Sequence, residues 1–282
     1  MAKVAVVTDS TADIPREERE RLGIEMVPLK VHFGDEVYLD NIDLTPGQFY
    51  QKLRAFDGLP TTSQPSPGDF LEVSKRLAES GHAIVSIHLS SAMSGTYQSA
   101  QLARSMLPDA DITVIDGRSV TYGLGMLVVG AAEAAAAGAS SREVVERVLA
   151  LRKAVRLYFL VDTLEYLHKG GRIGRAAALF GSLLNIKPIL TIDDDGVISP
   201  VEKVRGAKKA ITRIGERILA DFPNRPLEVT LAVTPGFTET AQDLEEHLKG
   251  TLDIRRFRIA EIGPVVGTHA GPGAAGVFVL PA

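Results

Sequence analysis

The feature that most constrains the fold is an alternation, in the first half of the chain, of short β-branched runs with longer stretches of helical periodicity. The β-branched runs fall at 3–8, 83–89 and 111–116, and the helical patterns at 67–80, 94–107, 119–138 and 140–153. Strands and helices that alternate in this way form a mostly parallel sheet with crossover helices. The first half therefore predicts an α/β layer domain.

After about residue 153 the apolar runs become more closely spaced. Strands are predicted at 157–162, 187–192, 197–204, 227–234, 254–262 and 276–280, with helices at 206–221 and 238–249. The run Asp193-Asp194-Asp195-Gly196 between two of these strands is typical of a hairpin turn and predicts antiparallel pairing. We therefore expect an α/β domain at 1–153, an α+β domain at 154–282, and a ligand site between them.

Composition narrows the classes of partner. The chain has 282 residues, and its 31 Lys and Arg against 35 Asp and Glu give a net charge of −4 without a long basic stripe, which argues against nucleic acid. Without cysteine there are no disulfides and no thiolate metal sites, and the chain suits a reducing compartment. The first apolar run turns polar at Thr8, too early for a signal peptide or a membrane span. We expect a cytoplasmic protein that does not span a membrane.

Ligands of open parallel sheets bind beyond the carboxyl ends of the strands, next to helix N-termini with free N–H groups. The strand at 83–89 leads into a run of small hydroxyls that contains Ser94, Gly95 and Thr96. Ser94 fits first of all a helix N-cap, and it also fits a donor that acts with the N–H of Gly95 on a carboxylate. Thr61 and Thr62, displayed between two prolines, fit either turn hydroxyls or a second part of such an anion site.

The segment 263–273 combines many Gly and Pro residues with one histidine. We read it as a loop that approaches a ligand closely, in which His269 donates a hydrogen bond to a carboxylate. A structural role for this histidine stays open. Two basic places, one at Arg172 and one at Arg205, fit either a solvated surface or an electropositive rim that docks an acidic partner.

Common catalytic and metal-binding patterns are missing from the sequence. It has no phosphate-loop motif and no H-E-x-x-H, and its six histidines lack the spacing of metal ligands. A Ser/His hydrolase with Ser94 as nucleophile, His269 as base and Asp9 as the orienting acid stays open as an alternative. Against it, the segment before Ser94 lacks the glycine that a nucleophile elbow uses.

Taken together, the motifs resemble those of the DegV family over nearly the whole chain. The resemblance rests on Asp9-Ser10-Thr11-Ala12-Asp13, Thr61-Thr62-Ser63-Gln64-Pro65-Ser66, Ser94-Gly95-Thr96-Tyr97-Gln98-Ser99-Ala100, Lys169-Gly170-Gly171-Arg172-Ile173 and Gly267-Thr268-His269-Ala270-Gly271-Pro272-Gly273-Ala274. Members of this family are fatty-acid-binding proteins, the lipid-carrying components of bacterial fatty acid kinase.

The resemblance implies a long-chain fatty acid in an apolar tunnel between the domains, with its carboxylate near Thr61, Thr62, Ser94, Gly95 and His269. It also implies a separate ATP-dependent kinase that phosphorylates the carboxylate, with Arg172 and Arg205 at the rim or docking surface. No catalytic residue, metal or cofactor is expected in this chain. Tunnel candidates are Leu124, Leu127, Leu179, Phe180, Leu183 and Ile186, each of which also fits an ordinary place in the hydrophobic core. A lipid-sensing module that does not pass its ligand on stays open as a further alternative.

Overall fold

The structure is a computed structural model that describes residues 3–181, 186–236 and 239–282. The chain forms two compact units. Unit 1 contains residues 1–44 and 60–153, and unit 2 contains residues 45–59 and 154–282. The division expected after residue 153 differs from these units in residues 45–59, which group with unit 2.

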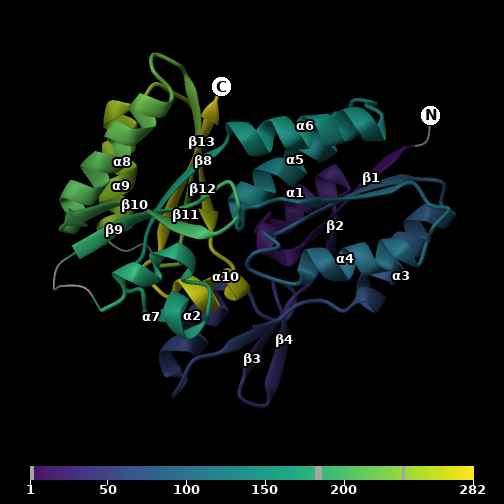
Figure 1. The fold of residues 1–282 in the computed structure, drawn as a ribbon, viewed down its shortest axis with the longest axis horizontal. Helices are drawn as coiled ribbons and strands as arrows, with labels where there is room; N and C mark the ends of the chain where they lie inside the picture. Colours follow the sequence, from purple (N-terminus) through teal and green to yellow (C-terminus); the bar gives the residue numbers. More distant parts are fainter. Residues whose placement is uncertain (1–2, 182–185, 237–238) are drawn as a thin grey trace. The chain divides into compact units, whose positions relative to one another are not determined.

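Unit 1 is built on a four-stranded, fully parallel sheet in the order β2-β1-β6-β7. Its strands are β1 (Val4–Asp9), β2 (Glu25–Val27), β6 (Ala83–His88) and β7 (Ile112–Asp116), and its helices are η1 (Ser10–Ala12), α1 (Arg16–Leu22), α3 (Pro67–Glu79), α4 (Thr96–Ser105), α5 (Tyr122–Ala136) and α6 (Ser141–Ala154). The three strands and four helices predicted for this half are confirmed (Figure 1).

The two faces of this sheet are covered by different helices. Phe70 and Leu77 of α3 and Ala100 and Ala103 of α4 pack on one face, in one core cluster with alternate residues of β1 and β7 and with Ile84 of β6. The Ala-rich α5 packs against β1 and β6. Gly130 allows its close approach to α6, since a Cβ there would collide with Leu151.

A second, small sheet in unit 1 was not predicted. It has the antiparallel order β4-β3-β5, with β3 (Lys30–Phe33), β4 (Glu36–Leu39) and β5 (Thr61–Ser63). Its strands have only three or four residues, so their sequences carry little periodicity. Its strand β5 carries Thr61 and Thr62, two of the predicted site residues.

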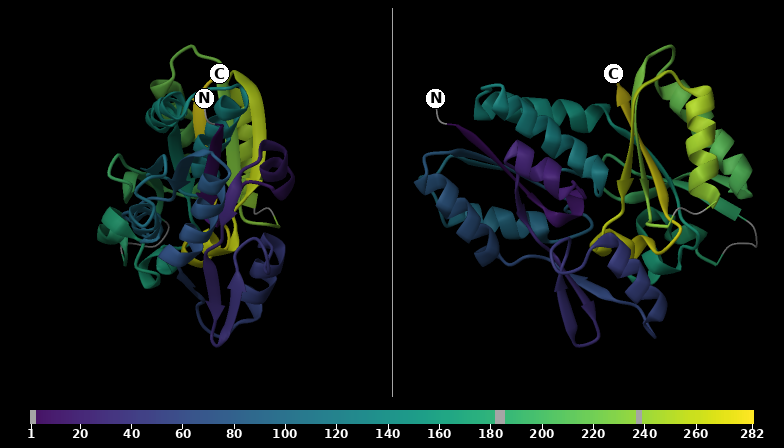
Figure 2. Two further views of the ribbon diagram at one scale, coloured as in Figure 1. Left: turned by 90° about the vertical axis from the view of Figure 1, so that its right-hand side faces the viewer. Right: turned by 180° about the vertical axis from the view of Figure 1, so that it is seen from behind.

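Unit 2 is built on a six-stranded sheet in the order β10-β9-β8-β13-β11-β12, in which only β11 and β12 are parallel. Its strands are β8 (Arg156–Leu160), β9 (Ile186–Ile192), β10 (Ile198–Arg205), β11 (Leu227–Val233), β12 (Ile254–Glu261) and β13 (Ala275–Pro281), and its helices are α2 (Pro46–Ala55), α7 (Glu165–Lys169), η2 (Gly174–Leu179), α8 (Ala207–Asp221), α9 (Glu239–Thr251) and α10 (Pro264–Ala270). Helices α8 and α9 lie side by side against the sheet (Figures 1 and 2). The mixed α/β class with an antiparallel-rich second half is confirmed.

The hairpin predicted at Asp193 is also confirmed. Strands β9 and β10 pair antiparallel, and the N–H of Gly196, at φ +77°, donates to the carbonyl of Asp193 at 2.8 Å. Arg175 of η2 forms ion pairs with Asp193 and Asp195. The carboxylates of the acidic turn are therefore paired with a side chain of the same unit, the guanidinium of Arg175.

Candidate functional site

The parallel sheet of unit 1 has its topological switch point between β1 and β6. From β1 the chain moves to β2 on one side and later returns to β6 on the other. The carboxyl ends of these two strands lead into η1 and into the segment 89–95. Ligands of open α/β sheets bind at this position, which is where the sequence placed Ser94.

Ser94 lies half-buried just before α4, and Gly95 is the N-cap of that helix. The Ser94 hydroxyl accepts a hydrogen bond from the N–H of Thr96 at 3.3 Å and lies 2.9 Å from the Thr96 hydroxyl. The interpretation of Ser94 as the helix N-cap is therefore wrong, because Gly95 holds that position and Ser94 makes a local turn contact just before it. Thr96 is fully buried. A hydroxyl has one proton and two lone pairs, so Ser94 can accept from Thr96 and still donate to a ligand.

Gln64 connects this segment to β5, a role that the sequence analysis did not assign. A Cβ on Gly95 would lie 2.6 Å from Nε2 and 2.8 Å from Cδ of Gln64, so the amide packs directly on the Cα of Gly95. The same amide donates from Nε2 to the Ser99 hydroxyl of α4 at 3.3 Å. Residue 95 must be glycine for this contact. The only signal in the sequence was the position of Gln64 shortly after two threonines.

Thr61 and Thr62 are on a strand, and strand geometry sends their side chains to opposite faces of the small sheet. Val31 is the cross-strand partner of Thr62 and is buried, whereas His32 is the partner of Thr61, which is exposed. His32 Nε2 lies 2.8 Å from the hydroxyl of Ser63 on the same face as Thr61. The two threonine hydroxyls therefore do not point the same way.

The hydroxyls at the end of β1 are used inside the protein. Thr8 donates to the carbonyl of Ile87 at 2.9 Å, and the Ser10 hydroxyl accepts from the N–H of Leu29 at 3.0 Å. Thr11 donates both its N–H and its hydroxyl to Asp9. All four residues from Thr8 to Thr11 are at most 1% exposed. They form an internal network that supports the neighbouring segment.

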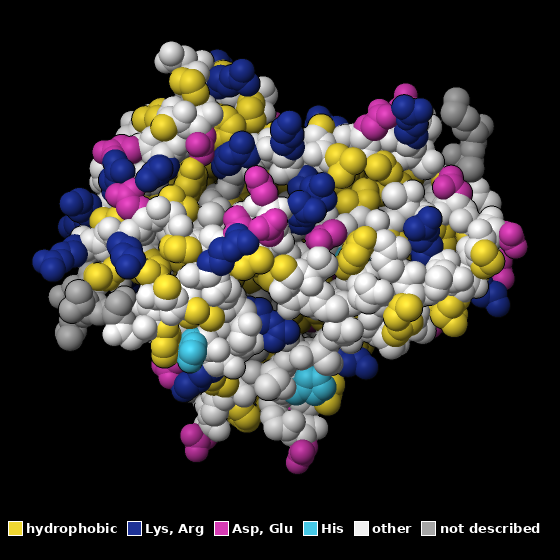
Figure 3. Space-filling model, in the orientation of Figure 1, with side chains coloured by type: hydrophobic (Ala, Val, Ile, Leu, Met, Phe, Trp, Pro, Cys, Tyr) yellow, Lys and Arg dark blue, Asp and Glu magenta, His cyan; other side chains and the backbone are white. Residues whose placement is uncertain are grey.

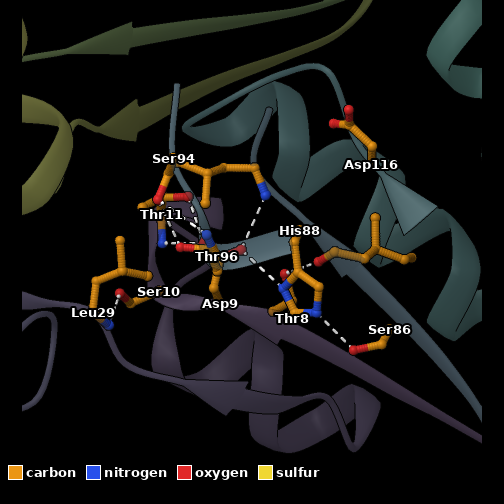
Figure 4. A network of polar contacts seen from close by, with 12 residues as sticks. Thr8, Asp9, Ser10, Thr11, Leu29, Ser86, His88, Ser94, Thr96 and Asp116 are labelled. Atoms are coloured by element: carbon orange, nitrogen blue, oxygen red, sulfur yellow. Dashed lines mark hydrogen bonds and ion pairs between the residues drawn. The ribbon is translucent and has the colours of Figure 1, made fainter. Parts of the chain in front are cut away.

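Asp9 also pairs with a histidine, but the partner is His88. His88 Nδ1 lies 3.0 Å from Asp9 Oδ2, and His88 Nε2 lies 2.6 Å from the Ser86 hydroxyl (Figure 4). The prediction that Asp9 orients His269 is wrong, because both of its carboxylate oxygens are occupied by donors of unit 1. The Ser86, His88 and Asp9 side chains have the connectivity of a hydrolase triad, yet Ser86 is only 3% exposed and His88 is fully buried.

His269 lies on α10, not in a loop, so the loop prediction for this segment is wrong. Pro264 occupies the first turn of the helix, and the N–H of Gly267 donates to the carbonyl of Gly263 at 2.8 Å. The glycines serve close packing. A Cβ on Gly267 would lie 2.8 Å from the ring of Phe49, and one on Gly271 would lie 2.7 Å from the ring of Tyr166.

The imidazole of His269 sits against the end of α7. It packs so closely on Gly170 that a Cβ there would collide with Nδ1. Burial, followed by the positive charge of Arg172, lowers the pKa of His269 to about 4. The ring is therefore neutral near pH 7 and carries one N–H, as a neutral hydrogen-bond donor requires.

The two predicted rim arginines have different surroundings. Arg172 is half-buried and donates to the carbonyl of Gly170 at 2.7 Å. Arg205 is exposed at the end of β10, and Lys203, Lys208 and Lys209 near it are also exposed. Figure 3 shows basic side chains interleaved with acidic ones over the α8 and β9–β10 region, at the left of the view. The exposed side chains of Lys203, Arg205, Lys208 and Lys209 are referred to as the exposed basic cluster, and acidic side chains lie on the same side of the view.

Unit 2 contains a pocket of about 230 Å³. Three of the predicted tunnel residues, Leu179, Phe180 and Ile186, line it together with Lys187 and Asp162. Leu124 and Leu127 are instead fully buried in α5 of unit 1, and Leu183 lies outside the described residues. Within the described part of the chain, no group of three or more potential metal ligands is found, and no helix is long and apolar enough to cross a membrane.

Comparison with known proteins identifies the family. A family model described as "Uncharacterised protein, DegV family" matches residues 3–282. A DegV domain-containing protein of Caldanaerobacter subterraneus is 43% identical over 281 residues, covering 99% of both chains. The chain therefore belongs to the DegV family.

Two solved structures show the same fold. A fatty-acid-binding DegV family protein from Thermus thermophilus superposes with a TM-score of 0.92 at 36% identity. The match covers 99% of this chain and 100% of that one. A stearic-acid-binding protein from Eubacterium ventriosum superposes with a TM-score of 0.85 at 29% identity, covering 100% of this chain and 98% of that one. DegV relatives thus bind fatty acids.

Proposed function

We propose that this chain binds a long-chain fatty acid and does not itself catalyse a reaction. The observation that carries the proposal is the set of neutral donors beyond the switch point of unit 1, in a chain whose relatives bind fatty acids. Ser94 contributes a hydroxyl and Gly95 an N–H at the N-terminus of α4, where the helix dipole favours an anion. Thr62 and His269 complete the proposed donor set, and Thr61 is left out because its side chain lies on the opposite face of β5.

The acyl chain supplies most of the affinity in this proposal. Each buried methylene contributes roughly 0.8 kcal/mol, so a chain of stearic acid length needs only orientation from the head-group donors. The pocket of unit 2 is smaller than the roughly 300–1,000 Å³ typical of ligand sites. It offers room for part of an acyl chain, with Leu179, Phe180 and Ile186 as apolar contacts.

We further propose that the bound fatty acid is presented to an ATP-dependent kinase. A carboxylate oxygen would attack the γ-phosphorus of ATP, forming the acyl phosphate and releasing ADP. Neutral donors favour this step, because they leave lone pairs on the carboxylate that a bidentate arginine would occupy. The exposed basic cluster around Arg205, together with Arg172, is proposed to dock an acidic surface of the kinase.

The first experiment identifies the ligand. Lipid extracted from the purified protein is analysed by mass spectrometry, and stearic acid binding is measured by calorimetry on delipidated protein. We expect a co-purified fatty acid and saturable binding. An absence of both contradicts the proposal, and turnover of an ester substrate would favour the hydrolase alternative.

The second experiment compares a serine variant with two matched threonine variants. Ser94→Ala and Thr62→Val each remove one proposed donor and should lower stearic acid affinity by about fivefold to tenfold. Thr61→Val changes the neighbouring hydroxyl on the opposite face of β5 and should stay within about twofold of the wild type. If Thr61→Val weakens binding and Thr62→Val does not, the proposed donor is on the wrong face of the strand.

A further inference from the structure

The segment that presents Ser94 is held by two carboxylates that do not belong to the proposed head-group site. The segment 89–95 follows β6, and the neighbours of β6 in the sheet are β1 and β7. Each of these strands ends in an aspartate, Asp9 on β1 and Asp116 on β7. Both side chains accept hydrogen bonds from the segment between them, and Figure 4 shows Asp9 beside Thr96 and Asp116 set apart from this group.

Asp9 holds the start of the segment. Its Oδ2 accepts the N–H of Leu89 at 3.0 Å and faces Nδ1 of His88 at 3.0 Å. Its Oδ1 accepts the N–H of Thr11 at 3.1 Å and the Thr11 hydroxyl at 2.5 Å. Four donors on two oxygens fill the acceptor sites of an ionised carboxylate. Nδ1 of His88 must then carry a proton, and Phe70 packs edge-on against the ring at 4.8 Å.

Asp116 holds the middle of the segment. Its Oδ1 accepts the N–H of Ser91 at 3.2 Å and the N–H of Arg118 at 2.9 Å, and its Oδ2 accepts the Ser91 hydroxyl at 2.6 Å. Between these anchors, the N–H of Ser90 donates to the carbonyl of Ser119. The Ser90 carbonyl then accepts the N–H groups of Met93 and Ser94, at 3.0 and 3.2 Å. Each aspartate is therefore linked to Ser94 through Ser90, by hydrogen bonds and a short stretch of backbone.

We propose that Asp9 and Asp116 are positioning residues that fix the Ser94 and Gly95 donors for a fatty acid carboxylate. This inference rests on the proposed function and deepens it. The two aspartates do not touch the ligand. They hold the backbone that carries the donors, and a donor displaced by about 1 Å loses much of its hydrogen bond to the ligand.

The two aspartates differ in whether an asparagine could keep the hydrogen bonds that the carboxylate accepts. At residue 116, an Asn carbonyl can keep both N–H donors, and the Ser91 hydroxyl can rotate to accept from the amide. At residue 9, each oxygen faces a backbone N–H, from Thr11 or from Leu89, so the amide nitrogen of Asn would oppose a donor in either orientation. Asp116→Asn should therefore be tolerated, whereas Asp9→Asn and Asp116→Ala should not.

The test compares affinities for stearic acid and for its methyl ester, which has the same chain and no charged carboxylate. We expect Asp9→Asn and Asp116→Ala to weaken acid binding by about tenfold and ester binding by less than about twofold, and Asp116→Asn to stay near the wild type. Glu143→Ala is the matched control, because Glu143 also accepts the N–H and hydroxyl of one serine, Ser140, at the start of α6. It should change neither affinity.

The outcomes separate this inference from the proposed function. Loss of acid and ester binding to the same extent, or an unchanged preference for the acid in Asp116→Ala, overturns the positioning role while fatty acid binding stands. If the wild type binds neither compound, the proposed function fails first. If Asp9→Asn does not fold, the Asp116→Ala and Asp116→Asn pair decides the question.

Discussion

Replacing Gly95 by alanine tests whether the Gln64 amide fixes the N-terminus of α4. The new Cβ would lie 2.6 Å from Nε2 and 2.8 Å from Cδ of Gln64, about 0.6–0.8 Å inside the ordinary contact range that begins at 3.4 Å. Either Gln64 rotates away and loses its bond to Ser99, or the segment that carries Ser94 shifts. Overpacking of this kind costs about 1–3 kcal/mol. The part of this cost that falls on binding comes from the shifted segment, because a displaced Ser94 loses its hydrogen bond to the ligand, so we expect stearic acid affinity to fall by about fivefold to tenfold.

The assay is a double-mutant cycle with Gln64→Ala, read by calorimetry on delipidated protein. Gln64→Ala alone removes a long hydrogen bond and should cost less than about threefold in affinity. It also removes the amide atoms that a Cβ at residue 95 would meet, so Gln64→Ala/Gly95→Ala should bind stearic acid nearly as well as Gln64→Ala. Gly68→Ala is the control, since a Cβ at this glycine of the first turn of α3 meets only the Ser66 hydroxyl at 3.5 Å. Equal losses in Gly95→Ala and the double variant refute the reasoning.

Two further predictions concern unit 2. The pKa of His269 is lowered from 6.5 to about 4, so the unfolded chain takes up a proton between these values and the folded chain does not. Lipid-free protein should lose about 3 kcal/mol of stability at this site as pH falls from 6.5 to 4. His269→Gln should lose less stability over this pH range in urea unfolding, and equal losses in the variant and the wild type would contradict the prediction. Gly273→Ala should lower the free energy of unfolding by at least about 2 kcal/mol, because φ is +80° and a Cβ would collide with Asp162, whereas Gly250→Ala, with nothing within 4 Å, should not; similar urea midpoints contradict this.

The large elements were predictable because their sequence signals are local. The β-branched runs that form β1, β6 and β7 and the capped start of α3 at Ser66 need no tertiary information. The small sheet of unit 1 was missed because β5 gains its order from β3, with Thr62 paired to Val31 far away in sequence. Such pairing leaves no periodicity in three residues.

Helix α10 shows why composition misled. Its glycines are typical of a loop, yet Gly267 is required where the helix meets Phe49 and Tyr50 of α2. Intrinsic propensity disfavours this helix, and tertiary packing overrides it. The sequence contained no signal for that contact, because α2 and α10 are separated by about two hundred residues.

The candidate site was predictable in part. The strand-end rule led to Ser94, and the structure places it beside the switch point of the parallel sheet. The supporting residues could not be found in this way. Asp9 and His88 meet only because β1 and β6 are neighbours, and their separation of 79 residues hides the contact from any local pattern.

The central claim is that neutral donors around Ser94 hold the carboxylate of a long-chain fatty acid. Carbon-13 NMR of stearic acid labelled at the carboxyl carbon observes that group directly in the bound state. We predict one bound carboxyl resonance, distinct from free stearate, that shifts in Ser94→Ala and keeps its position in Thr61→Val. A bound resonance that is the same in the wild type and in Ser94→Ala, or the absence of any bound signal, would contradict the claim.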